Sequence, residues 1–222
     1  MGVLLMLMTI GGLIVATVLL VVSVVTKKTW LTKFVLGGVA VWFVFYDVML
    51  LGFSLTSEEE TLALKEPKAF CGFYLDCHMH TAVSGVRTAK TLGDRTANGE
   101  YYIVKVAVFS NAVRATLGLT ELGANVIDAA GGHYHRDLKA EAQLPTQPEF
   151  EKRIGPEESF EKEIVFDLPF DVQDPRLDLR EGFGIDHMLE TVLVGDEDSI
   201  LHKRTYFKLG SEPGAVATGF FQ

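Results

Sequence analysis

Two long apolar runs dominate the first quarter of the chain, and alternating apolar and polar positions follow in the remainder. Residues Val3–Val25 contain no charged side chain, and Phe34–Phe53 contain only Asp47. A helix rises about 1.5 Å per residue, so each run can cross a hydrocarbon core of about 30 Å. The pattern predicts a transmembrane α-helical hairpin over residues 1–53, a linker over 54–78 and a folded domain over 79–222.

A cleaved signal peptide is the alternative interpretation of the first run. Signal peptides carry a basic segment, a shorter apolar core and a small-residue cleavage site. Met1-Gly2-Val3 contains no basic side chain, and the run that follows is longer than such a core. We therefore expect the first helix to remain as an anchor.

The charges that flank the two runs predict the orientation of the hairpin. Lys27, Lys28 and Lys33 lie at the connection, whereas Glu58–Glu60 follow the second run. Basic residues concentrate on the cytoplasmic side of membrane proteins. We expect a two-pass protein of a bacterial inner membrane, with both termini and the folded domain in the periplasm.

Residues 79–222 show the pattern of β-strands separated by turns. In Glu100–Ser110, Tyr102, Val104, Val106 and Val108 occupy one face of an extended segment. Several short strands at this spacing predict an antiparallel sandwich. Further strands are expected at 81–91, 125–129, 133–136, 160–167, 176–179 and 203–209, a short helix or ordered loop at 184–194, and the longest loop at 137–149.

Three segments of this region share a pattern of strand ends and hairpin residues. They read GEYYIVKVAVFSNAV, VIDAAGGHYHRD and IGPEESFEKEIVFDLP. They resemble the DUF4352-type immunoglobulin-like domain, and the resemblance implies an extracytoplasmic all-β sandwich without catalytic residues. It extends over residues 81–179 and departs from the family at Glu157, where a Gly is usual. The matching residues are Asn111, Asp128, Gly131, Pro156, Ser159, Phe166, Asp167 and Pro169.

The order of two helices and an outer sandwich is also similar to cytochrome oxidase subunit II. The dinuclear copper centre of that family needs two Cys four residues apart, with Glu, His and Met nearby. Cys71 and Cys77 are six residues apart, so a copper electron-transfer centre of that type is not expected.

Sulfur and imidazole side chains gather at the start of the folded domain. Cys71, Cys77, His78 and His80 could form a copper or zinc site, because thiolate and imidazole bind both metals. Alternatively the two Cys form a disulfide, as an oxidising compartment favours, or remain free thiols.

Two further histidines lie on a predicted strand. His133 and His135 share one face, because alternate residues of a strand point the same way. With Asp137 they could contribute metal ligands, or they could form a solvent-facing polar stripe. His187 and His202 stand apart from any other candidate ligand.

The hairpin contains one carboxylate and two pairs of small residues. Asp47 is costly inside a membrane and is expected to face protein or water, as a proton relay or pigment contact, or capped near the outer end. Gly11-Gly12 and Gly37-Gly38 are suited to close helix packing. All five residues are therefore predicted to contact a partner within the membrane.

The charge outside the hairpin excludes some partners. Residues 54–222 contain 17 basic and 28 acidic side chains, a formal net charge of −11. Nucleic acids and anionic lipids are therefore not expected as partners. A basic protein, such as a cytochrome c acting as electron carrier, is compatible with this charge.

No sequence motif indicates catalysis. The chain lacks a Gly-rich phosphate loop, a Gly-x-Ser-x-Gly elbow and a His-Glu-x-x-His helix. Our leading hypothesis is a non-catalytic accessory subunit, without a cofactor, of a photosynthetic or respiratory membrane complex. Its periplasmic domain would brace integral membrane subunits or dock an electron carrier. The alternatives are a copper- or zinc-handling protein that uses the Cys71–His80 segment, and a free-standing envelope binding module.

Overall fold

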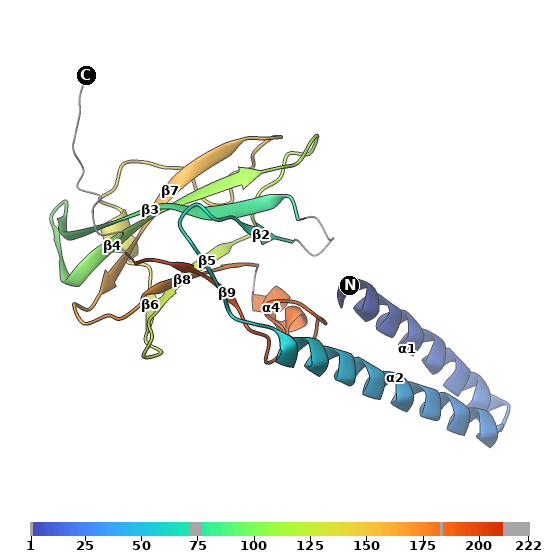
Figure 1. Cartoon of the computed structure of the whole chain (residues 1–222). Helices are drawn as coiled ribbons and strands as arrows, with labels where there is room; N and C mark the ends of the chain where they lie inside the picture. Colours follow the sequence, from blue (N-terminus) through green and yellow to red (C-terminus); the bar gives the residue numbers. More distant parts are fainter. Residues whose placement is uncertain (1, 72–76, 183, 211–222) are drawn as a thin grey trace. The chain divides into compact units, whose positions relative to one another are not determined.

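The computed structural model describes residues 2–71, 77–182 and 184–210 (Figure 1). The chain divides into two compact units. One contains Met1–Glu60 together with Phe183–Arg204, and the other contains Thr61–Gly182 together with Thr205–Gln222. The segment 183–204, which the sequence analysis includes in the domain from residue 79 onward, thus groups with the helices.

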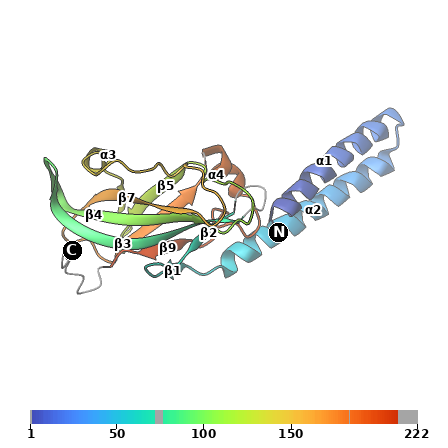
Figure 2. The same ribbon diagram turned by 90° about the horizontal axis from the view of Figure 1, so that it is seen from above.

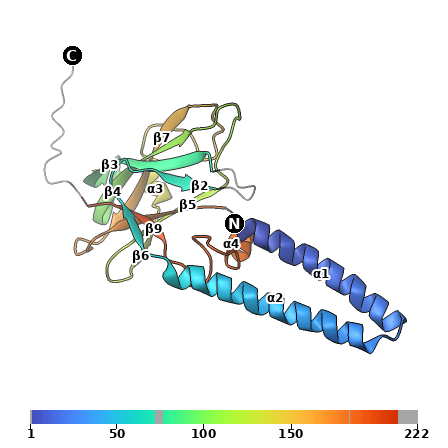
Figure 3. The ribbon, with the colours of Figure 1, turned by 45° about the vertical axis from the view of Figure 1, so that its right-hand side comes forward.

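Two long apolar helices form the body of the first unit. Helix α1 spans Gly2–Val25 and α2 spans Thr29–Thr56, and both are long and apolar enough to cross a membrane. They run side by side (Figures 1 and 3). Trp42 Nε1 donates a hydrogen bond of 3.0 Å to Thr9 Oγ1, and the hydroxyls of Ser23 and Thr32 lie 2.7 Å apart, so polar contacts tie the two helices together.

A short segment between the last two strands of the sequence packs on α2. It contains helix α4 (Gly184–Glu190). Val194 shares a small buried cluster with Tyr46 and Leu50, and Tyr46 Oη donates a 2.6 Å hydrogen bond to the Val192 carbonyl. The hydroxyls of Ser54 and Ser199 lie 3.4 Å apart. These contacts explain why the segment belongs to the helical unit.

The second unit is a β-sandwich, as predicted, and Figure 2 shows its sheets from above. The two sheets contain five and four strands. In spatial order, the first contains β1 (Glu60–Leu62), β9 (Thr205–Lys208), β8 (Arg176–Glu181), β5 (Leu122–Ile127) and β6 (His133–His135), and the second contains β2 (Lys68–Phe70), β3 (Met79–Leu92), β4 (Arg95–Ser110) and β7 (Ser159–Leu168).

Alternation along β4 and β7 builds the core between the sheets. The predicted face of β4, represented by Val104 and Val106, packs in one buried cluster with Phe160, Ile164 and Phe166 of β7. β4 pairs with β7 in an antiparallel register that places Val104 opposite Ile164. The predicted apolar face of this strand is therefore confirmed.

The opposite face of β4 is buried as well. Tyr101 and Ile103 form a second cluster with Ala140, which lies in helix α3 (Leu138–Glu141). The sequence predicts only a loop here, because four residues carry too little periodicity to indicate a helix. The segment instead covers the sheet and explains the unbroken apolar character of the middle of β4.

The same segment covers the free edge of β7. Gln147 pairs with the backbone of Glu163 as a strand would, because its Oε1 accepts from Glu163 N at 2.8 Å and its Nε2 donates to Glu163 O at 2.6 Å. Glu141 Oε1 accepts from Val165 N at 3.1 Å, and Asp137 N donates to Val165 O at 2.8 Å. Side chains, together with the Asp137 backbone amide, thus replace a neighbouring strand at an edge that would otherwise invite pairing with another chain.

Candidate binding groove

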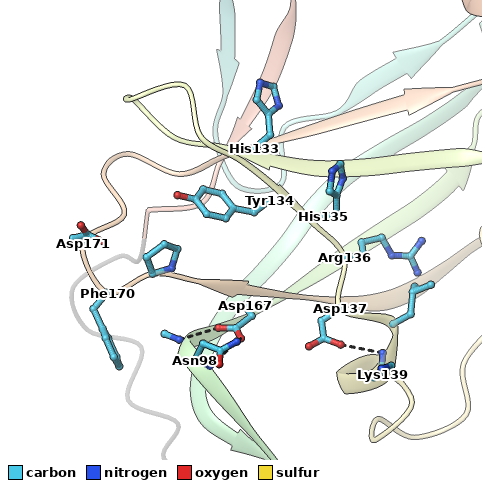
Figure 4. A pocket seen from close by; sticks show the side chains of 13 residues that line it. Asn98, His133, Tyr134, His135, Arg136, Asp137, Lys139, Asp167, Phe170 and Asp171 are labelled. Carbon is cyan, nitrogen blue, oxygen red and sulfur yellow. Dashed lines mark hydrogen bonds between the residues drawn. The ribbon is translucent and has the colours of Figure 1, made fainter.

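An open groove of about 980 Å³ lies beside β6, where β6 and the end of β7 diverge (Figure 4). An isolated β-bridge links Arg136, the residue after β6, to Phe166 of β7. The walls include Asn98, Gly99, Tyr134, Leu138, Asp167 and Phe170.

The hairpin that presents β6 is fixed by Asp128. Its Oδ1 accepts from Gly132 N at 2.7 Å and Ala130 N at 2.9 Å, and its Oδ2 accepts from Tyr134 Oη at 2.9 Å. These donors, the Gly132 amide foremost, hold the pKa of the Asp128 carboxyl below its ordinary value. Gly131 adopts a φ of +83°, which an L side chain rarely does. The hairpin therefore sets the position of Tyr134 at the groove.

The opposite wall is fixed by Asp167 at the end of β7. Its Oδ2 accepts from Asn98 N and Nδ2, each at 2.9 Å, and its Oδ1 accepts from Gly99 N at 3.0 Å. A Cβ at Gly99 would lie 1.8 Å from the Leu168 carbonyl oxygen, so only glycine fits there. Asp167 thus joins the β4 backbone to the end of β7.

The rim of the groove exposes large apolar side chains. Phe170 is 74% exposed and Leu138 is 64% exposed. The Lys90 ammonium lies 4.8 Å from the centre of the Phe170 ring, which favours one orientation of that ring. Exposed aromatic side chains at a concave surface are typical anchors of protein interfaces.

The backbone of β6 offers a second means of contact. β6 is the last strand of its sheet and pairs with β5 on one side only. An extended peptide can add to such an edge through main-chain hydrogen bonds, while side-chain pockets provide specificity. Within the described residues, no three groove side chains bring metal-ligating atoms together. The arrangement is suited to binding a protein segment.

The predicted cluster at Cys71–His80 contains a disulfide. Cys71 and Cys77 are bonded, with Cα atoms 3.9 Å apart, so neither sulfur is available as a thiolate ligand while the bond is intact. His78 Nδ1 lies 2.6 Å from Asn111 Oδ1. The His80 ring stacks on Phe109, with centroids 5.2 Å apart. Residues 72–76 of this cluster lie outside the described part of the chain.

The second predicted pair, His133 and His135, projects to one side of β6, as strand alternation requires (Figure 4). Both side chains are exposed, and His135 Nδ1 lies 2.6 Å from Asn125 Oδ1. Asp137, the proposed companion, caps α3 through its Oδ1, which accepts from Lys139 N at 3.0 Å and from Ala140 N at 2.9 Å. The polar-stripe interpretation fits this arrangement, and the metal interpretation stays a prediction.

The predicted contact residues of the hairpin are all exposed. Apart from the neighbouring backbone of its own helix, no described atom lies within 4 Å of a Cβ built at Gly11, Gly12, Gly37 or Gly38. Gly12 and Gly38 line an apolar cavity of about 400 Å³ between α1 and α2. Asp47 is exposed on α2. The hairpin leaves the space beside these small residues unfilled.

The sequence analysis missed one cluster of potential ligands. His187, Glu190 and Asp198 place one ligand atom each within 4.8 Å of the others. The spacing of His187 and Glu190, three residues apart, is a helix signal that sequence reasoning could have used. Asp198 lies in a loop, and the sequence does not predict that this loop brings Asp198 close to His187.

Comparison with known proteins identifies the sandwich. The family described as a domain of unknown function (DUF4352) matches residues 76–187. No curated protein matches the chain. The family carries no catalytic description, and the likeness to cytochrome oxidase subunit II is not confirmed.

Solved structures with a similar arrangement include three bacterial proteins. A secreted protein of Mycobacterium tuberculosis, MPT63, is 12% identical with a TM-score of 0.42, and the match covers 69% of this chain and 99% of that one. An uncharacterized β-sandwich protein of Clostridium difficile 630 is 11% identical with a TM-score of 0.39, covering 69% and 96%. A conserved hypothetical protein of Bacillus anthracis is 12% identical with a TM-score of 0.37, covering 52% and 94%.

Proposed function

The chain belongs to the DUF4352 family, and we propose that it is a non-catalytic, membrane-anchored binding protein. In this proposal α1 and α2 span a membrane as a hairpin, and the sandwich lies outside the cytoplasm. The length and apolar character of both helices support the anchor. Lys27, Lys28 and Lys33 at the connection support an orientation with both termini outside.

Asp47 is the observation that carries this proposal. The carboxylate is exposed on an apolar helix, nine residues before the helix ends at Thr56. A carboxylate at such a position is costly against lipid and is normally placed against protein or water. We infer that it faces a polar or basic group on a transmembrane helix of a partner protein.

The small residues of the hairpin support the same partner. The exposed surfaces at Gly11 and Gly37 let a helix backbone approach closely, and packing at small residues drives helix association in lipid. Lipid chains could also fill this space, but they offer no partner for Asp47. A transmembrane helix satisfies both features, whereas lipid would fill only the space at the small residues and water would solvate only Asp47.

Purification from native membranes in a mild detergent tests this proposal. Wild-type chain is expected to migrate with another membrane protein at a fixed ratio. Asp47→Asn should reduce that recovery about tenfold, because a polar contact between membrane helices contributes about 1–2 kcal/mol. Glu58→Gln neutralises an exposed carboxylate just beyond α2 and should have no effect. A wild-type chain that migrates alone, or equal recovery of the two variants, would overturn the proposal.

We propose that the groove binds an extended segment of the same partner. The uncovered edge of β6 and the exposed Phe170 ring support this occupant. Phe170→Ala should weaken recovery of the partner and change the free energy of unfolding by no more than about 1 kcal/mol, the value of the exposed cation–π contact with Lys90. Val113→Ala is the matched control, because Val113 is 83% exposed and does not line the groove. Equal recovery with both variants would exclude the groove and leave the hairpin contact standing.

An energy-converting complex, respiratory or photosynthetic, is the partner class that we propose. The net charge of −11 over residues 54–222 supports a basic partner, such as a soluble cytochrome c, near this domain. Association with such a carrier should weaken steeply as ionic strength rises. Binding that is insensitive to salt would remove the carrier from the proposal.

A further inference from the structure

Three side chains of the segment that packs on α2 bring ligand atoms together. His187 Nδ1 lies 3.0 Å from Glu190 Oε2 and 3.5 Å from Asp198 Oδ2. All three atoms lie within 4.8 Å of one another, and the site is distinct from both the groove and Asp47.

The local fold aims these atoms at one point. His187 and Glu190 lie one turn apart in α4 and therefore share a face of the helix. The chain then turns back, with Ile200 N donating to the Thr191 carbonyl at 2.9 Å. Arg204 Nη2 contacts Asp198 Oδ1 at 3.2 Å, so the other carboxylate oxygen, Oδ2, faces His187.

The surroundings are partly buried and rich in carboxylates. The side chains of His187, Glu190 and Asp198 are 29%, 26% and 15% exposed. Burial, reinforced by the neighbouring Asp196 and Asp198, raises the pKa of Glu190, although His187 opposes that shift. Burial likewise raises the pKa of Asp196. Among the described residues, Arg204 contacts Asp198, and His202 opposes the rise in the pKa of Asp196.

We propose that His187, Glu190 and Asp198 bind a divalent transition-metal ion, with Zn²⁺ as the expected metal. Bonds of about 2.0–2.2 Å around a tetrahedral zinc ion separate its ligand atoms by about 3.3–3.5 Å. The 3.5 Å from His187 Nδ1 to Asp198 Oδ2 matches that separation, and the 3.0 Å contact with Glu190 Oε2 is a hydrogen bond that the ion would replace. An imidazole nitrogen in the set favours zinc over calcium and magnesium, which prefer oxygen ligands. Water would complete the coordination.

A bound ion would hold the segment 184–204 in its fold. It would join α4 to the loop that carries Asp198, and the same loop contributes Val194 and Ser199 to contacts with α2. A metal ion that binds the folded chain but not the unfolded chain stabilises the fold by mass action. The segment should therefore be protected from proteolysis when zinc is present.

The test uses the full chain without a histidine tag, in detergent micelles, after treatment with EDTA. Titration with Zn²⁺ is expected to give one ion per chain, and Co²⁺ should give the visible absorption of a tetrahedral site. His187→Ala and Asp198→Asn should each weaken zinc binding at least tenfold. Glu190→Gln keeps the size of the side chain and should also weaken it. His133→Ala combined with His135→Ala is the control and should leave this binding unchanged.

Three other outcomes of these experiments would refute the proposed metal site. Absence of zinc binding by the wild type would overturn the proposal, as would equal zinc affinity of wild type, His187→Ala and Glu190→Gln. If His187 instead titrates by NMR with no effect of zinc, a proton shared with the two carboxylates occupies this position and the metal site is refuted. Circular dichroism of each variant verifies that the fold is retained.

Discussion

Replacement of Gln147 by leucine tests how the edge of β7 is protected. The Gln147 amide makes two hydrogen bonds to the backbone of Glu163, of 2.8 and 2.6 Å. Leucine has a similar size but neither donates nor accepts, so both backbone groups of Glu163 lose their side-chain partner. The contact is local, and the sheet hydrogen bonds between β4 and β7 remain.

The expected loss is about 2 kcal/mol in the free energy of unfolding. An intramolecular hydrogen bond contributes about 0.5–1.5 kcal/mol, which gives about 1–3 kcal/mol for two. Both bonds are partly buried, so water replaces them incompletely after the substitution. With a guanidinium slope of about 4 kcal/mol per molar, the unfolding midpoint should fall by about 0.5 M.

The assay is guanidinium unfolding of the full chain in detergent, followed by tyrosine circular dichroism. Trp30 and Trp42 both lie in α2, so tryptophan fluorescence does not report on the sandwich. Gln143→Leu is the control, because Gln143 is exposed in the same segment. If Gln147→Leu and Gln143→Leu shift the midpoint equally, the amide does not protect the edge, and the account given for β7 is refuted.

Three further predictions use the same unfolding assay. At Glu157, where φ is +58°, Glu157→Gly should be about 1 kcal/mol more stable than Glu157→Ala, because glycine adopts this backbone without a steric penalty; equal stability would contradict it. The lowered pKa of Asp128 means that its stabilisation is present above the ordinary pKa of the carboxyl and is lost as the pH falls through the lower folded-state value. The free energy of unfolding of wild type should therefore exceed that of Asp128→Asn by a constant amount near neutral pH. If this difference does not become smaller in acid, the prediction is refuted. Replacing Cys71 and Cys77 by serine should cost about 2 kcal/mol, the loop-closure value for a short loop, and an unchanged midpoint would show that the bond does not constrain the unfolded chain.

The long elements of this protein were predictable because their signals are repeated many times. The apolar runs of α1 and α2 leave few alternatives, and β4 repeats its alternation with a period of two residues, which a helix does not show. Motif residues such as Asp128 and Asp167 also indicated the family correctly. In the structure both carboxylates accept backbone hydrogen bonds, so what the family pattern identifies here is the framework of the fold.

The short elements and the new cluster depend on contacts that sequence spacing does not encode. Strands β1 and β2 contain three residues each, too few to show alternation, and they lie in the predicted linker. Helix α3 is determined by the packing of Ala140 on Tyr101, which is distant in sequence. Asp198 joins His187 only because the chain turns back after α4. Each of these features depends on the three-dimensional path of the chain.

The placement of residues 184–204 sets a limit on how this protein can be shortened. A soluble fragment that begins after α2 would retain Val194 and Ser199 but lose Tyr46, Leu50 and Ser54, against which they pack. An apolar surface formed for those helices would then face water and favour aggregation. A fragment intended for crystallisation should therefore carry two changes. It should begin after α2, and a short linker from β8 to β9 should replace residues 184–204.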